Sequence, residues 1–450
     1  MANQLLYSDK ILRINDFSLL GMVQSEDWSP TFNATDVFEL GRESKLDTGM
    51  ELEVSGSFEM LTIGGLPGVL ARMIVARNSS GDFGGYVYNS GGAPTSNTYG
   101  VSGAGGKNAY TITESALKEV IGNLVEHERS DNATFDRTKV FPRIFLSNIS
   151  GRADANGYAS ETIAWQGDYV IGAKSPYHDI RVLHGIRASG TTFNIKDVYT
   201  GANWVGTNYA IMYIYVNERR FRSNTSGDAD FFTFTTPASG LCTLTSASGF
   251  TLAASDLITA IMYKSSSPSS TFPTLAASDR FTTPFYMRGY QIDLFIGPSS
   301  TFSPVASEQW LKVQSIDWTI DPRVEALRQI AFNTLGSTVF ARVPTYPINV
   351  SVNASVFETD WADWKQVLLR GGRTFPGNNV YQDVYDLAPP SLNTFSVHCK
   401  YKTKAGVTVQ QLVFDDLRVD GYGNRVNVGG RAEVTWSFTG TSFQLDGGNA

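Results

Sequence analysis

Three glutamates on one stretch are the first residues whose type and spacing could do chemistry. Glu51, Glu53 and Glu59 alternate with apolar residues in Met50–Met60, MELEVSGSFEM. A period of two over this length predicts an extended strand with one buried face and one wet face. Carboxylates that act as acid and base need environments that drive their pKa values apart. These glutamates are spread along a single wet face, so they indicate an acidic lining and not a catalytic pair.

No other candidate for catalysis or metal binding has the spacing that its chemistry requires. The four histidines share no ligand spacing, and His127 is expected at the end of a helix. Gly103–Asn108, GAGGKN, is similar to a phosphate loop, but valine replaces its first glycine and asparagine replaces the Ser/Thr that binds magnesium. Asp415-Asp416 is expected to be a solvated pair before a turn. We therefore predict that the chain is not an enzyme and binds no cofactor and no metal.

A second alternating stretch lies far along the chain, at Ile348–Val356, INVSVNASV. Its polar side chains are small, and neither stretch carries Lys or Arg among them. Two long strands of this kind predict a wall around water. The residues expected to face that aqueous lumen are Glu51, Glu53, Ser55, Ser57, Glu59, Asn349, Ser351, Asn353 and Ser355.

Short sequence matches in the same order indicate that one β-rich unit occurs twice. Val23–Trp28, VQSEDW, recurs as VQSIDW at Val313–Trp318, an offset of 290 (313−23). A sequence motif that recurs at a fixed offset indicates that the same structural unit occurs more than once in the chain. Two weaker matches pair Ser57–Glu59 with Val356–Glu358, an offset of 299 (358−59), and Glu161–Gln166 with Ala432–Ser437, which places the tryptophans 271 apart (436−165).

Three helices are expected beside these strands. Leu66–Arg77 has proline in its first turn, and Trp361–Arg370 follows Asp360 as N-cap and ends at two glycines. Thr113–Glu128 is expected to be amphipathic. Its apolar stripe consists of Leu117, Val120, Ile121, Leu124 and Val125.

Composition predicts a β-rich, ordered protein of several domains. The chain has 450 residues, 42% hydrophobic and 18% charged, with 42 glycines, which argues against disorder. The net charge of −7 gives no electrostatic basis for gripping nucleic acid. Cys242 and Cys399 are expected to be reduced thiols. We expect no signal peptide and no membrane span.

The predicted fold class is mainly β, with two related β-sandwich or barrel-forming domains, each with a flanking helix, and an insertion between them. The first domain is expected to span residues 1–178 and the second residues 284–450. Residues 179–283 have no counterpart in the other half, and their alternating runs predict an inserted β-sandwich-like domain.

The twin motifs and the alternating strands give this layout a resemblance to a known family. It resembles the major tail tube proteins of long-tailed, siphovirus-type bacteriophages, and the versions with two tube domains in one chain match best. The resemblance covers roughly residues 1–176 and 284–450 and rests on VQSEDW, VQSIDW, the alternating strands, and the strands containing Trp165 and Trp436.

The resemblance implies rings that stack into a hollow tube through which the genome passes. It implies three chains per ring in pseudo-sixfold symmetry, with the chain itself as partner and with tape measure, terminator and baseplate proteins as further partners. DNA would transit without specific binding, and the protein would be located in the virion tail after assembly in the host cytoplasm. The inserted domain is expected on the outer surface, and Asn78–Asn108 is expected between rings or outside.

Three alternatives stay open. The chain could be a baseplate or connector protein that forms a single ring on the same fold. It could be a host-surface or carbohydrate-binding protein that uses the aromatics of its middle domain. A β-helix or sandwich hydrolase is a third alternative, which the lack of a paired catalytic constellation disfavours.

Overall fold

The structure is a computed structural model. It describes residues 10–14, 17–18, 23–37, 47–62, 110–113, 121–129, 135–167, 170–174, 180–187, 192–194, 209–216, 219–223, 230–236, 241–246, 256–264, 286–298, 313–328, 339–357, 394–402, 404–426 and 432–447. These residues are almost entirely β-strand, with one 3₁₀ turn, η4 (Gly289–Gln291). The expectation of a mainly-β protein is therefore confirmed.

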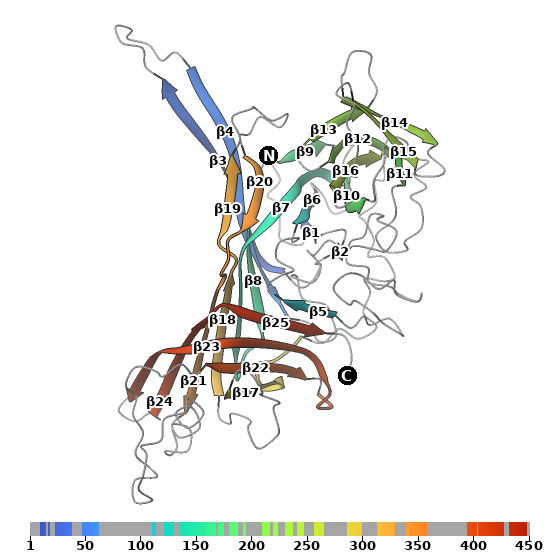
Figure 1. The fold of residues 1–450 in the computed structure, drawn as a ribbon. Helices are drawn as coiled ribbons and strands as arrows, with labels where there is room; N and C mark the ends of the chain where they lie inside the picture. The colour runs from blue at the N-terminus through green and yellow to red at the C-terminus, as the bar shows by residue number, and fades with distance from the viewer. Residues whose placement is uncertain are drawn as a thin grey trace, which may run out of the picture.

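One large antiparallel sheet of sixteen strands contains segments from both ends of the sequence (Figure 1). Its strands are β1 (Lys10–Ile14), β2 (Phe17–Ser18), β3 (Val23–Val37), β4 (Asp47–Leu61), β5 (Tyr110–Thr113), β6 (Ile121–Arg129), β7 (Phe135–Asp154), β8 (Ser160–Gly167), β9 (Ile171–Lys174), β17 (Ile292–Pro298), β18 (Val313–Asp321), β21 (Asn349–Phe357), β22 (Phe395–Lys402), β23 (Thr408–Val426), β24 (Ala432–Gly440) and β25 (Ser442–Gly447).

Within this sheet, two sets of six strands pair in the same order. The first set is β1-β6-β7-β8-β4-β3 and the second set is β17-β22-β23-β24-β21-β18. β9 pairs with β7 as β25 pairs with β23. The alternating strands predicted around Met50–Met60 and Ile348–Val356 are β4 and β21, which occupy equivalent places.

Irregularities in the pairing fix the equivalence residue by residue. The bulges at Gly122/Leu124, Glu128/Arg129 and Leu146/Asn148 in the first set recur at Phe395/Val397, Tyr401/Lys402 and Val419/Gly421. Each recurrence has an offset of 273 (395−122, 401−128, 419−146). Because a bulge belongs to particular residues and not to a strand in general, this agreement is strong support for the equivalence.

The bulge at Val23/Ser25 recurs at Val313/Ser315, which agrees with the offset of 290 between VQSEDW and VQSIDW.

The two weaker sequence matches are misaligned. At these bulges Met60 lies opposite Val23, and Val356 lies opposite Val313. Met60 and Val356 are therefore equivalent, which gives an offset of 296 (356−60) and not 299. Trp165 is equivalent to Phe438, and Trp436 to Ile163, an offset of 273 and not 271. Short matches among aromatic and β-branched core residues do not define register.

The long strands β7 and β23 join two layers in each set. The first half of β7 pairs with β6 and β9, and its second half pairs with β8 and β18. Equivalent aromatic pairs fill the space between the layers. The rings of Trp28 and Phe141 are 5.1 Å apart, and those of Trp318 and Phe414 are 6.0 Å apart. Aromatic pairs at these separations stabilise a core beyond their buried area.

The two sets are joined by direct pairing of β18 with β7. Ser315–Ile320 lies antiparallel to Ile149–Asp154, with Trp318 opposite Gly151. A Cβ atom on Gly151 would lie 2.3 Å from the Trp318 ring, so only glycine allows the indole to pack against the β7 backbone here. This junction makes one continuous sheet out of two sets.

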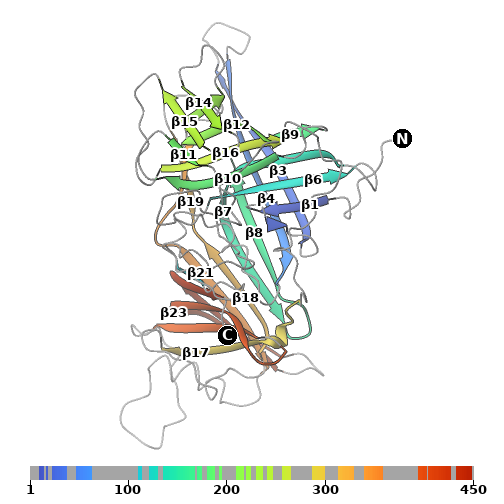
Figure 2. The same ribbon diagram turned by 90° about the vertical axis from the view of Figure 1, so that its right-hand side faces the viewer.

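Residues between the sets form a separate seven-stranded sheet, beside β7 and β9 in both ribbon views (Figures 1 and 2). Its strands are β10 (Ile180–Arg187), β11 (Thr192–Asn194), β12 (Tyr209–Val216), β13 (Arg219–Ser223), β14 (Asp230–Thr236), β15 (Leu241–Ser246) and β16 (Asp256–Lys264). The domain boundaries predicted from sequence stay predictions.

A two-stranded ribbon, β19 (Val324–Arg328) with β20 (Val339–Pro344), continues β18 and β21. In Figure 1 it projects upward in the same direction as the outer part of the β3–β4 hairpin. Both sets therefore extend a hairpin from the same end of the sheet.

The prediction of a helix at Thr113–Glu128 is wrong. Thr113 ends β5, and Ile121–Arg129 is strand β6, paired on both sides with β1 and β7. Leu124, Val125 and Glu126 are all buried, so this strand lacks the alternation that identifies a half-exposed strand. His127 accordingly lies within a strand and not at a helix end. The helices predicted at Leu66–Arg77 and Trp361–Arg370 lie outside the described residues.

Replacement of Gly151 by alanine is expected to weaken the junction between the sets. The new methyl group must displace the Trp318 ring, and overpacking of this kind costs about 1–3 kcal/mol. Chemical denaturation followed by tryptophan fluorescence measures this loss. Gly172→Ala on β9 is the matched control, because a Cβ atom there meets nothing within 4 Å. Equal stability of the two variants would contradict this packing.

Candidate functional site

The candidate site is the wall, which we define as the eight neighbouring strands β3-β4-β8-β7-β18-β21-β24-β23. Four strands come from each set, and the β18·β7 junction lies at the middle. Residues directly opposite each other on paired strands project from the same face of a sheet, so the pairings define two rows of side chains that cross the wall.

The two faces of the wall have opposite chemistry. One row consists of Ser25, Glu59, Thr162, Ser150, Thr319, Ser351, Thr439 and Arg418, all polar. The adjacent row, on the other face, consists of Glu26, Phe58, Ile163, Ile149, Ile320, Val350 and Gly440. The apolar face packs on the second layer, which leaves the polar face on the open side.

The residues predicted to line a lumen lie together on the polar face. Glu53, Ser55, Ser57 and Glu59 are half-buried on β4, at positions equivalent to Asn349, Ser351, Asn353 and Ser355 on β21 at the offset of 296 (349−53). Asn349 is exposed, and Ser355 is buried with its hydroxyl bonded to Glu433. Glu51 lies on β4, but its side chain is outside the described set. Three strands separate β4 from β21, so the two stretches do not touch.

Sequence reasoning missed most of the polar face. The alternation that identified β4 is also present in Val313–Asp321, whose burial alternates along its second half, and in Ser160–Gly167, where it alternates throughout. The residues that this signal could have found include Ser160, Thr162, Ser315, Asp317, Thr319 and Asp321, and the match of VQSEDW to VQSIDW adds Asp27 as the equivalent of Asp317.

A charged group marks the junction on the polar face. The Arg152 Nε atom lies 3.1 Å from Asp154 Oδ2 and 3.6 Å from Asp317 Oδ1 on β18. The hydrogen bond to Asp154 and the charges of Asp154 and Asp317 raise the pKa of Arg152. Burial raises the pKa of Asp317 against the opposing charge of Arg152. These side chains are 45–65% exposed, so each ion pair contributes at most about 1 kcal/mol and mainly fixes register.

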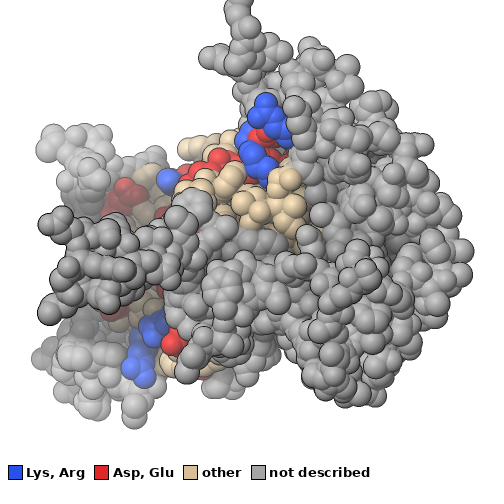
Figure 3. Space-filling model, turned by 90° about the horizontal axis from the view of Figure 1, so that it is seen from above, with Lys and Arg blue, Asp and Glu red and all other residues tan. Residues whose placement is uncertain are grey.

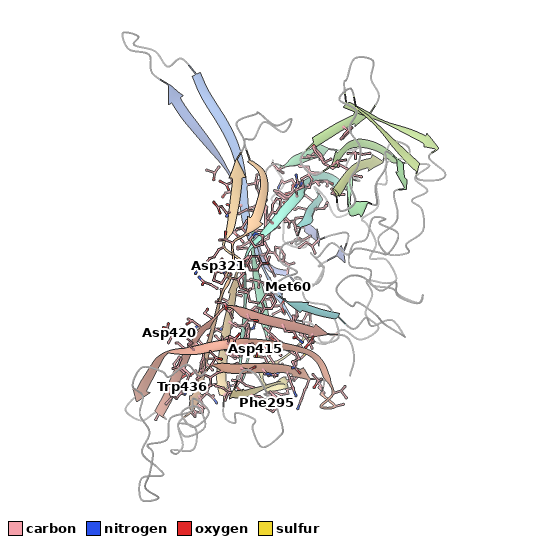
Figure 4. The ribbon with its side chains drawn as sticks, viewed as in Figure 1. Met60, Phe295, Asp321, Asp415, Asp420 and Trp436 are labelled. Atoms are coloured by element: carbon pink, nitrogen blue, oxygen red, sulfur yellow. The ribbon has the colours of Figure 1, made fainter. Side chains whose placement is uncertain are left out.

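Acidic groups predominate among the described side chains of the polar face. The acids are Asp27, Glu53, Glu59, Asp154, Asp317, Asp321 and Glu433, whereas the bases are Arg152, Arg418 and Arg323, which follows β18 and donates a hydrogen bond to Asn349. In Figure 4, Asp321 and Asp420 lie on the open side of the wall and Met60 on the packed side. Seen from above, the described Lys and Arg side chains lie next to Asp and Glu (Figure 3). The described side chains therefore provide no cluster of positive charge, on the polar face or in the view from above, of the kind that binds phosphates.

Behind the edge strand β3, the first set contains a cluster of ionisable side chains. Lys10 Nζ lies 2.5 Å from Glu126 Oε1, and Lys139 Nζ lies 2.6 Å from Glu128 Oε1. Glu26 on β3 completes the cluster, and its buried Oε1 accepts no hydrogen bond. Burial and the charge of Glu126 raise the pKa of Glu26 to about 7. Burial opposes ionisation of Glu126, but the hydrogen bond and charge of Lys10 outweigh it and lower the pKa.

All five positions are replaced by largely apolar residues in the second set. The equivalents of Lys10, Glu26, Glu126, Glu128 and Lys139 are Ile292, Ile316, Cys399, Tyr401 and Leu412. The ionisable cluster, with its buried Glu126 and Glu128, is therefore a property of the first set. Cys399 is a free thiol, and burial raises its pKa to about 12.

Among the described residues, no group of three or more His, Cys, Asp or Glu side chains converges as a metal site would. His398 on β22 is buried, which lowers its pKa to about 4. Its Nε2 lies 2.8 Å from Ser396 Oγ, and its Nδ1 lies 3.2 Å from Gln411 Nε2. This neutral ring acts as a core hydrogen-bonding group. The loop Gly103–Asn108 lies outside the described part of the chain.

Comparison with known proteins identifies no family. No family of known proteins matches the chain, and no curated protein matches it. A solved structure of the "TodX monoaromatic hydrocarbon channel deltaS2 mutant" aligns over 98% of this chain and 88% of its own, with 6% identity and a TM-score of 0.08. A score this low carries no argument. In the described segments, no helix is long and apolar enough to cross a membrane.

The stability of the protein is expected to depend on pH through Glu26. Its folded-state pKa of about 7 exceeds the ordinary value of 4.5, so the folded state binds the proton more tightly than the unfolded chain does. This contribution is complete below pH 4.5 and is lost as pH rises through 7. Between pH 5 and 8, the wild type should lose up to about 3 kcal/mol more unfolding free energy than Glu26→Gln.

Urea denaturation at a series of pH values tests this expectation. Glu59→Gln is the control, because it removes a carboxylate from the paired strand on the opposite face, outside the cluster. Parallel pH profiles for the wild type and Glu26→Gln would contradict the account, as would a pH profile for Glu59→Gln that matched Glu26→Gln.

Proposed function

We propose that this chain is a structural virion protein that polymerises as stacked rings into a hollow bacteriophage tail tube. The observation that carries the proposal is the wall, eight strands with one apolar, packed face and one polar, open face on which acids outnumber bases. A wall of this kind is suited to enclose water when neighbouring chains continue it.

Three chains per ring would close the wall into a barrel of 24 strands (3 × 8). With strands about 4.8 Å apart and tilted by about 40°, the backbone diameter would be about 48 Å. This is wider than a DNA duplex. The two equivalent sets in each chain would give the ring pseudo-sixfold symmetry, as the resemblance to tail tube proteins implies.

The acidic lining fits a conduit and not a binding site. Glu53 and Glu59 would repel the phosphate backbone, and Ser55 and Ser57 between them carry no positive charge that could hold it. A genome could then pass without being held. The sheet of β10–β16 would be carried on the outer surface.

Electron microscopy of the purified protein in negative stain tests the assembly. The proposal predicts tubes of variable length built from stacked rings. Isolated rings that never stack would support the runner-up function, a single-ring baseplate or connector protein. Particles that remain monomeric at high protein concentration would contradict both functions.

Replacement of Glu53 and Glu59 by lysine is expected to leave tube assembly intact but to slow DNA passage at least several-fold. Six lysines per ring would attract phosphates, whereas surface substitutions change folding stability by only about 0.5 kcal/mol. Phage carrying the variant would be assayed for the rate of genome ejection, with Glu53→Gln/Glu59→Gln as the matched control. Normal ejection by tubes carrying the lysines would contradict an acidic lumen.

A further inference from the structure

Two edges of the wall have no partner strand among the described residues, and the structure shows how equivalent edges are used. β3 pairs only with β4, and the second half of β23 pairs on one side only, with β24. Their equivalents are β18 and the second half of β7. These two strands pair with each other at the junction inside the chain. An unpaired edge is a template for another strand.

We propose that β3 of one chain pairs antiparallel with β23 of a second copy, in the register of the internal junction. The junction pairs Ile320 with Ile149 and Ile316 with Ala153. Applying the offsets of 290 and 273 places Pro30 opposite Tyr422 and Glu26 opposite Val426. This proposal deepens the proposed function and rests on it for the closure of a ring.

Charge complementarity supports this register. Asp317 lies opposite Arg152 at the junction, with 3.6 Å between Oδ1 and Nε. The equivalent of Asp317 is Asp27, and the equivalent of Arg152 is Arg425. An acid and an arginine thus occupy both positions again, now on the two unpaired edges. Asp27 is exposed, and its carboxylate accepts a hydrogen bond from Ser57.

The burial of two equivalent tryptophans supports the same partner. Trp318 is only 6% exposed, and β7 covers its ring through Gly151. Trp28 packs on Phe141 in the equivalent way but is only half-buried. In the proposed pairing, Asn424 of the neighbouring copy lies opposite Trp28, where the junction has Gly151. Because Asn424 carries a Cβ atom, the Trp28 ring would lie beside that residue and not as close to the neighbouring backbone as Trp318 lies to β7. The second copy would still cover the exposed part of Trp28.

Two different edges meet in this contact, so it is a head-to-tail contact. Such contacts build a closed ring when the rotation between units closes and a filament when it does not. The contact between chains repeats the β18·β7 junction within a chain. The same rotation would therefore relate each set of six strands to the next one around the assembly.

Reversal of one charge is expected to weaken assembly, and reversal of both is expected to restore it. Asp27→Arg and Arg425→Asp should each reduce the assembled fraction at least tenfold in sedimentation velocity, whereas the two changes in one chain should restore it. In a mixture of the two single variants, favourable contacts require alternating chains, which a ring of three does not allow. Unchanged assembly of both single variants would contradict the register.

Disulfide trapping tests the pairing directly. Asp27→Cys/Arg425→Cys should form covalent multimers under mild oxidation, with the 27–425 link identified by mass spectrometry. Asp27→Cys/Gly423→Cys, two residues out of register, should not. The matched positive control is Arg152→Cys/Asp317→Cys, which should form the equivalent link within one chain, because the Cα atoms of directly opposite residues lie about 4.5–5.5 Å apart, within the range of a disulfide.

The outcomes separate this pairing from the tube. A 27–425 link in rings that do not stack supports the pairing and contradicts the tube. If tubes form the 27–423 disulfide, the proposed register is wrong but the tube function stands. The same conclusion follows if tubes form neither disulfide while the positive control forms its link. Monomers without any link between chains contradict both.

Discussion

The pairing of β18 with β7 is the interaction on which the arrangement of this protein depends. Each set of six strands has its own second layer and its own aromatic pair between the layers, within one hydrophobic core that includes residues of both sets. Backbone pairing at the junction adds one set to the other as neighbouring strands of a single sheet. The polar residues of both sets therefore lie on one continuous face. Gly151 makes the close approach possible, and Arg152 with Asp317 favours one register over its alternatives.

The two sets share strand order and pairing register but differ in what they bury. Behind β3 the first set buries carboxylates that pair with partly exposed lysines, whereas the second set has isoleucine, leucine, cysteine and tyrosine at the same positions. An ionic cluster is costly to bury unless every group is paired, and Glu26 has an unpartnered oxygen. This cluster distinguishes the first set from the second, and Glu26 lies on the edge strand β3 that we propose to contact another copy.

Much of the wall could be predicted from sequence because its strands are half-buried. Alternation of polar and apolar residues is a direct consequence of one wet face, so β4 and β21 were identified with nearly correct bounds, and VQSEDW and VQSIDW gave the correct offset. β6 could not be identified in this way, since partners cover both its faces and its apolar residues follow no period of two. Pairing between distant strands has no local signal, so neither the junction nor the bulges could be predicted.

An electron cryomicroscopy reconstruction of the assembled protein at side-chain resolution tests the central claim most directly. The account predicts that the wall continues from chain to chain as one closed sheet, with Ser25–Pro30 beside residues 422–426 of the next copy. Glu53 and Glu59 should then line the central channel. A reconstruction in which the polar face is turned outward, or in which β3 and β23 do not adjoin another chain, would contradict it.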